Sequence, residues 1–154
     1  MADFEYFNIM EVDPNFTPVE EGIYKVRINK MTKKSKTYPD DPSRDTLVWV
    51  NGDFVITDHE KFSGRRLFPT FWLSNSFDLK ALRKVADRTG VVQTPGQSFE
   101  DWLDSLTTQQ PEIKVKIDIV PVIDRVTKQP KVDEYSGKPL MENKINFREV
   151  FPAN

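Results

Sequence analysis

Apolar and polar residues alternate along much of the chain, and a period of two residues is typical of β-strands with one buried face. The alternation is clearest in residues 22–32 and 112–123, where Tyr, Val or Ile occupies successive second positions. Residues 46–57, 65–73 and 145–150 hold further apolar, aromatic and β-branched residues, which favour strands. We therefore predict five strands, with a bulge or turn at Asn51-Gly52 and an edge or bulge position at Pro69.

Between the third and fourth predicted strands the apolar period changes to that of helices. Asn75 or Ser76 is placed to cap a first helix, and Gly90 is placed to end it. Ser98, followed three residues later by an acid, indicates the start of a second helix that ends before Pro111. Two helices therefore interrupt the series of strands.

The connections at residues 33–45 and 124–143 are too polar to pack, so we predict an exposed loop at each. No internal repeat is apparent. The order of elements is that of an OB fold, in which the first and fourth loops border the binding groove. We predict a mainly β protein: a five-stranded OB-fold-like barrel over residues 22–150, with a helical insertion between strands three and four. An acidic N-terminal arm, 1–21, precedes it, and a short tail, 151–154, follows.

Composition removes several classes of function. A chain of 154 residues is the size of one domain, and it has no cysteine and a single histidine, His59. Disulfides, thiol catalysis and multi-histidine metal sites are therefore excluded. There is no apolar stretch of membrane-spanning length and no signal-like N-terminus, so we expect a soluble, cytoplasmic protein without membrane contact. Because phosphate-binding glycine motifs and nucleophile elbows are also missing, we expect neither an enzyme nor a cofactor or metal.

Charge is distributed in blocks, although the formal net charge is only −2. Residues 1–21 hold six acids and no base, whereas residues 25–44 hold seven bases against two acids. Residues 125–148 hold six bases against three acids. Because the two basic blocks include both predicted groove loops, the distribution favours a polyanionic ligand.

Aromatic residues accompany these bases. If Val50 and Phe54 point into the barrel, the period of two turns Trp49 outward, and the same argument turns Phe68 and Trp72 outward. Bases of single strands stack on such rings while Lys and Arg contact the phosphates. We predict single-stranded DNA as the partner, and an OB groove accepts RNA as well. The candidate stacking residues are Tyr38, Trp49, Phe68, Trp72 and Tyr135, and the candidate phosphate contacts are Lys33, Lys34, Lys36, Arg44, Arg65, Arg66, Lys128, Lys131 and Lys138.

Two alternatives stay open. In a structural or protein-interaction module, the outward aromatics would form a subunit interface of a homo-oligomer, and the basic loops would only be solvated. In a metal-dependent nuclease, Asp58, His59 and Glu60 would hold a divalent ion. Consecutive residues of a strand or turn point in different directions, which disfavours this metal site.

Short motifs spread over residues 4–150 resemble a family of small single-stranded-DNA-binding proteins from the replication and recombination cassettes of tailed phages. The motifs are Gly22-Ile23-Tyr24-Lys25-Val26-Arg27-Ile28, Gly64-Arg65-Arg66-Leu67-Phe68, Phe71-Trp72-Leu73-Ser74-Asn75, Leu79, Leu82 and Gly90 of the first helix, Tyr135-Ser136-Gly137-Lys138 and Asn143-Lys144-Ile145-Asn146-Phe147. The resemblance implies an OB-like fold that coats single strands without catalysis or metal, alongside phage replication or recombination proteins in the host cytoplasm. It also implies roles for Arg65, Arg66, Phe68, Trp72, Tyr135 and Lys138.

The sequence departs from many single-strand binders at its C-terminus, where residues 148–154 contain no acidic run. Recruitment of partners by an acidic tail is therefore not expected. The acidic N-terminal arm around Asp3–Asp13 is the candidate substitute, and our hypothesis is that it occupies the basic groove of the free protein and is displaced by DNA.

Overall fold

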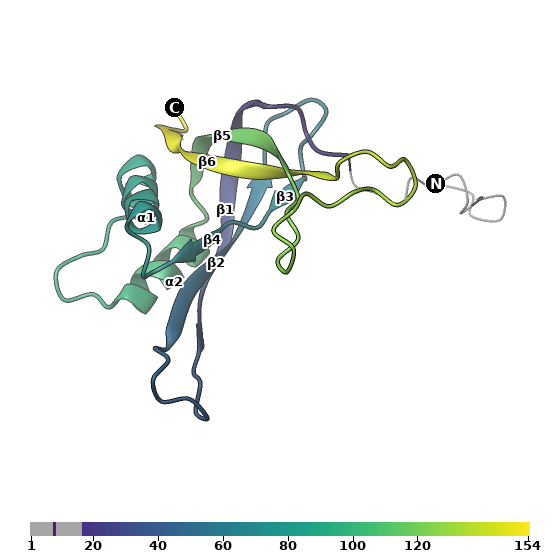
Figure 1. Ribbon diagram of the computed structural model, residues 1–154. Coiled ribbons are helices and arrows are strands. Elements are labelled where there is room, and N and C mark those ends of the chain that lie inside the picture. The colour runs from purple at the N-terminus through teal and green to yellow at the C-terminus, as the bar shows by residue number, and fades with distance from the viewer. Residues whose placement is uncertain (1–7, 9–16) are drawn as a thin grey trace.

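An antiparallel sheet of six strands and two helices makes up the computed structural model, which describes residue 8 and residues 17–154 (Figure 1). Most of the acidic arm, residues 1–7 and 9–16, lies outside the described residues. The elements are β1 (Gly22–Lys36), β2 (Leu47–Ile56), β3 (Arg66–Leu67), β4 (Thr70–Trp72), α1 (Ser76–Thr89), α2 (Phe99–Gln109), β5 (Glu112–Pro121) and β6 (Met141–Pro152). The structure is therefore mainly β, as the alternation predicts, with both helices between β4 and β5.

The sheet is open, so the predicted five-stranded OB-fold-like barrel is not closed. Its strand order is β3-β2-β1-β5-β6, with β4 also paired to β2, and no ladder joins β3 or β4 to β6 within the described residues. The N-terminal segment lies between these two edges instead. The Arg65 guanidinium donates to the Thr17 carbonyl at 2.6 Å, and the Asn143 side chain exchanges two hydrogen bonds with the Val19 backbone. Val19 is only 1% exposed, so this segment belongs to the core.

Pro69 divides the predicted third strand into β3 and β4, which makes six strands rather than five. The Pro69 carbonyl accepts a hydrogen bond from the Gly52 N–H at 2.8 Å, and a Cβ at Gly52 would lie 3.0 Å from Pro69 Cγ. Gly52 therefore permits a close approach inside a continuous β2, and the predicted bulge or turn at Asn51-Gly52 is wrong. The irregularity lies in β1, where the register shifts between Ile28 and Lys30.

Strand β1 is longer than the sequence pattern indicates. Residues 33–36, predicted to begin an exposed loop, continue the ladder until Lys36 pairs with Leu47. The hairpin of β1 and β2 consequently projects from the body of the molecule (Figure 1). This geometry places Lys33, Lys34 and Lys36 on a regular strand.

The core lies between the inner face of the sheet and the two helices. Its largest fully buried side chains include Phe54, Phe71, Ile28, Ile113 and Leu106. Asn75 caps α1 and Ser98 caps α2, as predicted, because their side chains accept backbone N–H groups of the first turns. Both helices pack on the inner face of the sheet. The outer face of β1, β2 and β4 is not covered by them and carries the candidate site.

Candidate nucleic-acid interface

A row of three side chains crosses the outer face of the sheet. In the antiparallel register Trp49 of β2 lies between Lys34 of β1 and Trp72 of β4. Directly opposed residues project to the same face. The two indole rings are 5.3 Å apart between centroids at an interplanar angle of 41°, and Trp72 is 40% exposed. A cation therefore lies beside an accessible aromatic pair.

Phe68 extends this surface along the edge of the sheet. Because Leu67 and Phe71 point inward, the alternation turns Arg66, Phe68 and Trp72 outward, as the sequence predicts. Phe68 is 68% exposed, and the Arg66 guanidinium lies 5.9 Å from its ring centroid. The outer face thus presents three aromatic side chains, from β2, from β4 and from the segment between β3 and β4.

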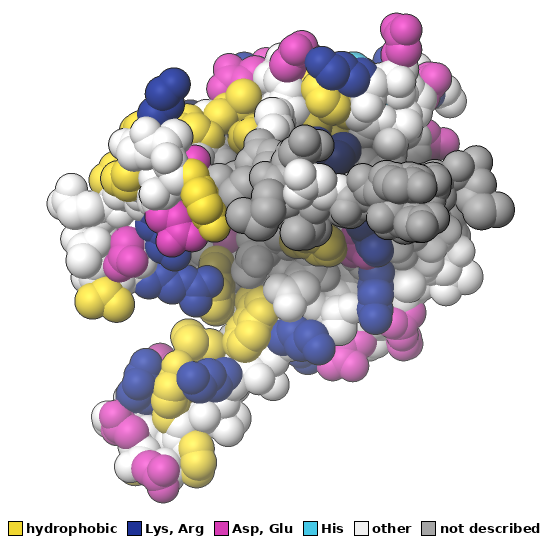
Figure 2. Space-filling model, turned by 90° about the vertical axis from the view of Figure 1, so that its right-hand side faces the viewer, with side chains coloured by type: hydrophobic (Ala, Val, Ile, Leu, Met, Phe, Trp, Pro, Cys, Tyr) yellow, Lys and Arg dark blue, Asp and Glu magenta, His cyan; other side chains and the backbone are white. Residues whose placement is uncertain are grey.

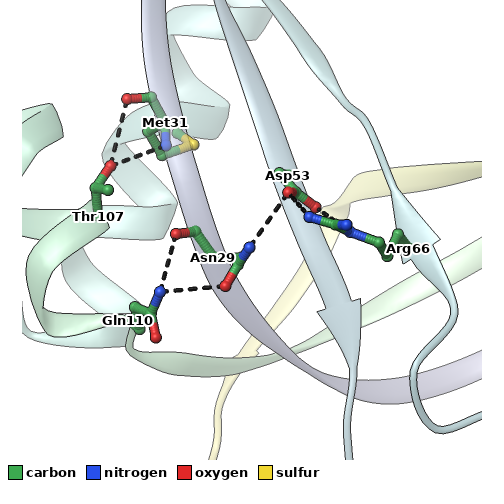
Figure 3. A network of polar contacts seen from close by, with 6 residues as sticks. All are labelled: Asn29, Met31, Asp53, Arg66, Thr107 and Gln110. Atoms are coloured by element: carbon green, nitrogen blue, oxygen red, sulfur yellow. Dashed lines mark hydrogen bonds and ion pairs between the residues drawn. The ribbon is translucent and has the colours of Figure 1, made fainter.

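A polar network fixes Arg66 in place (Figure 3). Its guanidinium donates two hydrogen bonds to the Asp53 carboxylate, and Asn29 donates to the same carboxylate at 3.3 Å. Gln110, just after α2, donates to Asn29. The hydrogen bond and the negative charge of Asp53 raise the pKa of Arg66. Arg66 is therefore a positioned cation whose charge is largely compensated.

Two other predicted phosphate contacts are already engaged. Lys33 projects to the face opposite Lys34 and pairs with Glu100 of α2 at 2.8 Å, which lowers the pKa of Glu100. Arg65 donates to the Thr17 carbonyl rather than facing solvent freely. The other predicted phosphate contacts in the β1–β2 hairpin, Lys34, Lys36 and Arg44, form no ion pair within the described residues.

Tyr38 lies near the tip of the projecting hairpin between two cations. The Arg44 guanidinium is 3.7 Å from its ring centroid, and the Lys36 ammonium is 5.3 Å away. Basic and hydrophobic side chains are interleaved along this hairpin, with acids at its tip (Figure 2). The hairpin therefore offers the combination of ring and cation that single-strand binders use.

The β5–β6 connection supplies the second group of predicted contacts. Lys128, Lys131, Tyr135 and Lys138 are all exposed, and none of the three lysines forms an ion pair within residues 17–154. Tyr135 is 70% exposed. The structure does not bring these residues into contact with the Trp49–Trp72 pair.

A groove of about 740 Å³ lies where the sheet is not closed, with the β4 edge on one side and β6 on the other. We call it the seam groove. Its lining includes Phe68 and Trp72 together with Phe77, Arg125 and Lys144, which the sequence reasoning did not select. Arg125 and Lys144 belong to the basic block at 125–148. They line the same groove as Phe68 and Trp72 because β6 does not pair with β3 or β4. The groove provides a path from the aromatic pair toward the β5–β6 connection.

Two of the three residues proposed for a nuclease metal site, Asp58 and His59, have other partners. Asp58 lies 3.9 Å from the Lys25 ammonium group. His59 Nδ1 accepts hydrogen bonds from the backbone N–H groups of Lys61 and Phe62, and its ring stacks on Phe62 at 5.0 Å. Across residues 17–154, no group of three His, Cys, Asp or Glu side chains is arranged to hold a metal ion. None of the described helices is long and apolar enough to cross a membrane.

Comparison with known protein families and curated proteins found no relative of this chain. The resemblance to phage single-stranded-DNA-binding proteins therefore stays a prediction from short motifs.

Proposed function

We propose that the protein binds single-stranded DNA with little sequence preference, by stacking bases and neutralising phosphates, and that it has no catalytic activity. The strand order supports an OB-like architecture, since β1 lies between β2 and β5 and the helices precede β5. The resemblance in sequence supports a role in phage DNA replication or recombination, with other proteins of those processes as partners.

The row of Lys34, Trp49 and Trp72 carries this proposal. An accessible pair of indole rings offers stacking surface to unpaired bases, worth about 1–3 kcal/mol per base. The neighbouring ammonium group of Lys34 has no ion-pair partner in the described part of the chain and is free for a phosphate. Folding alone does not require large rings and an unpaired cation on an exposed sheet face.

The balance of charge favours single strands over duplex. Duplex binding without sequence preference depends on attraction between Lys and Arg side chains and the phosphates. Here the formal net charge of the protein is −2, so this attraction is weak overall. Arg66 and Lys33 are further compensated by Asp53 and Glu100. Stacking must therefore supply much of the affinity, and only unpaired bases expose their faces for it.

Fluorescence anisotropy tests the proposal. The probe is a labelled dT oligonucleotide longer than the roughly 4–16 nucleotides that one OB fold covers, compared with its duplex and with a rU oligonucleotide. We expect tight binding to dT, much weaker binding to the duplex, and affinity that falls between about 50 and 200 mM salt. The rU arm measures the preference between DNA and RNA.

Trp72→Ala should weaken dT binding by about 1–3 kcal/mol. Leu79→Ala, which alters an exposed apolar residue on α1, should leave it unchanged. Equal affinity for single strand and duplex, or no binding at low salt, would overturn the proposal. If the protein does not bind dT at low salt, the alternative of a protein-interaction module is favoured, in which the outward aromatic residues form a protein interface.

A further inference from the structure

The β5–β6 connection contains a repeat that the sequence reasoning overlooked. Residues 123–131 read IDRVTKQPK and residues 132–140 read VDEYSGKPL, so a β-branched residue and Asp open each nine-residue segment and Pro is its eighth residue. We name these segments unit one and unit two. Each forms a short hairpin, closed by a bridge between Ile123 and Pro130 in unit one and between Val132 and Pro139 in unit two.

Hydrogen bonds at equivalent positions show that the two hairpins share one design. Asp124 Oδ1 accepts from the N–H two residues later at 2.8 Å, and Asp133 Oδ1 does the same at 2.9 Å. The N–H four residues after each Asp donates to the carbonyl of that Asp. The donors, Lys128 and Gly137, both have a left-handed backbone, with φ of 60° and 72°. The polar connection is therefore an ordered pair of turns rather than an irregular loop.

A ring of three backbone hydrogen bonds joins the bases of the two hairpins. Lys131 donates to Val122 at 2.7 Å, Leu140 donates to Lys131 at 2.8 Å, and Val122 donates to Leu140 at 2.9 Å. These residues stand nine positions apart and close the ends of both units on β5 and β6. The hairpins are consequently held in a fixed arrangement, which lowers the entropy lost when a ligand binds.

The units differ in what they display. Unit one carries Arg125, Lys128 and Lys131, none of which forms an ion pair among the described residues, while its one acid, Asp124, is occupied in the turn. Its tip residue, Val126, is 90% exposed. The equivalent tip residue of unit two is Tyr135, accompanied by one base and two acids. The two hairpins therefore have the same backbone conformation, but unit one presents three cations and unit two presents an aromatic ring.

We propose that the units divide the work of one binding element: unit one contacts phosphates, and unit two stacks a base on Tyr135. The inference rests on the proposed function, because it assigns roles within the same single-strand site. Arg125 also lines the seam groove beside Phe68 and Trp72, so unit one lies next to the aromatic face. A strand leaving that face reaches the cationic unit first.

Deleting each unit separately tests the division. Deletion of residues 123–131 leaves Val122 bonded to Leu140, so unit two still closes on the same bridge. In this variant the fall of log K with log salt should become shallower by about 2, since each lost phosphate contact of a single strand removes about 0.7 from its steepness. Deletion of residues 132–140 removes one lysine, so it should make the slope shallower by only about 0.7, and the lost stack on Tyr135 should weaken dT binding by about a further ten-fold.

Point variants keep the test valid if a deletion fails to fold. The triple variant Arg125→Ala, Lys128→Ala, Lys131→Ala should reproduce the loss of slope, and Tyr135→Ala should reproduce the salt-independent loss of affinity. In the swap Val126→Tyr with Tyr135→Val, equivalent frames should preserve affinity within about two-fold. Effects of the deletions and point variants that do not separate into slope and affinity would overturn the division. Binding of dT by the full chain that is weakened by Trp72→Ala, with no effect of any unit variant, would overturn this inference alone and leave the proposed function standing.

Discussion

Lys33 and Lys34 are adjacent in sequence, but the strand turns them to opposite faces of the sheet. Lys34 lies beside Trp49 on the outer face, whereas Lys33 reaches α2 and pairs with Glu100 at 2.8 Å. An exposed ion pair adds little stability, about 0–1 kcal/mol, but it compensates the charge that a phosphate would meet. Availability of a base therefore depends on its strand position as well as on its exposure.

This difference predicts separate outcomes for two substitutions of the same kind. Lys34→Ala should make the salt slope of dT binding shallower by about 0.7, because one phosphate contact is lost. Lys33→Ala should leave the slope unchanged and let the pKa of Glu100 rise toward its ordinary value. Anisotropy titrations over a salt series measure both slopes. Equal slopes for the two variants would contradict the assigned faces.

The positions of the aromatic side chains follow from the period of two, but the partners of the bases do not. Trp49, Phe68 and Trp72 point outward because their neighbours Val50, Leu67 and Phe71 fill the core. Glu100 is far along the chain from Lys33, and Thr17 is far from Arg65, so no local pattern reveals these contacts. The sequence therefore predicts the candidate rings of the sheet and leaves the free cations to be identified from the fold.

At the scale of elements, the segment before β1 stabilises the open sheet. The Asn143 amide donates to the Val19 carbonyl at 2.9 Å and accepts from the Val19 N–H at 2.8 Å, much as a neighbouring strand would. This contact ties β6 to the chain that enters β1. Together with Arg65 and Thr17, it bridges the two unpaired edges of the sheet.

Asn143→Ala should therefore lower the free energy of unfolding by about 1–3 kcal/mol, because both backbone groups of Val19 lose their partner. Lys144→Ala, an exposed change on the same strand, should alter it by less than about 0.5 kcal/mol. Urea unfolding followed by circular dichroism compares the two. A loss no larger in the first variant than in the control would show that the bridge is not stabilising.

Acid should loosen the hairpin of unit one at a defined pH. Backbone N–H groups of Thr127 and Val126 hold the pKa of Asp124 below its ordinary value of 3.8, and Lys131 adds attraction. A depressed pKa means that the turn is fully stabilised above pH 3.8 and loses this stabilisation as the pH falls through the lowered value. Amide chemical shifts of Val126 and Thr127, compared with Asp124→Asn, report the transition. A midpoint above 3.8 would contradict the hydrogen-bonded turn.

Elements with one buried face could be predicted from sequence, and elements without one could not. Strands β2 and β5 and both capped helices follow their periodic patterns. The end of β1, residues 33–36, is mostly polar and exposed, and only pairing with β2 makes it a strand. Likewise, units one and two are fixed by Asp side chains and backbone hydrogen bonds rather than by apolar contacts, so hydrophobic periodicity does not reveal them.

On the scale of the whole molecule, charge is separated along the chain. The acidic arm enters the described structure at Thr17, whose carbonyl is held by Arg65 next to Arg66 and Phe68. Asp13 is four residues from that point, or at most about 14 Å of extended chain. This tether supports the hypothesis that the acidic segment competes with DNA for the basic surface.

If the hypothesis holds, deletion of residues 2–13 should tighten dT binding at low salt, because it removes four acids that compete with phosphates. The gain should shrink as salt is raised, since screening weakens the competing attraction. Anisotropy titrations of the full chain and the deletion variant over a salt series provide the measurement. Unchanged affinity at low salt would remove the hypothesis.

Stacking of bases on the outer aromatic pair is the central claim, and the indole N–H signals of the ¹⁵N-labelled protein test it most directly. The three tryptophans supply their own control, because Trp102 is buried and its Nε1 donates to the Val91 carbonyl at 2.7 Å. Addition of oligo-dT should shift the signals of Trp49 and Trp72, assigned with Trp→Phe variants, and leave that of Trp102 in place. Saturation with dT that moves neither outer signal would contradict the account.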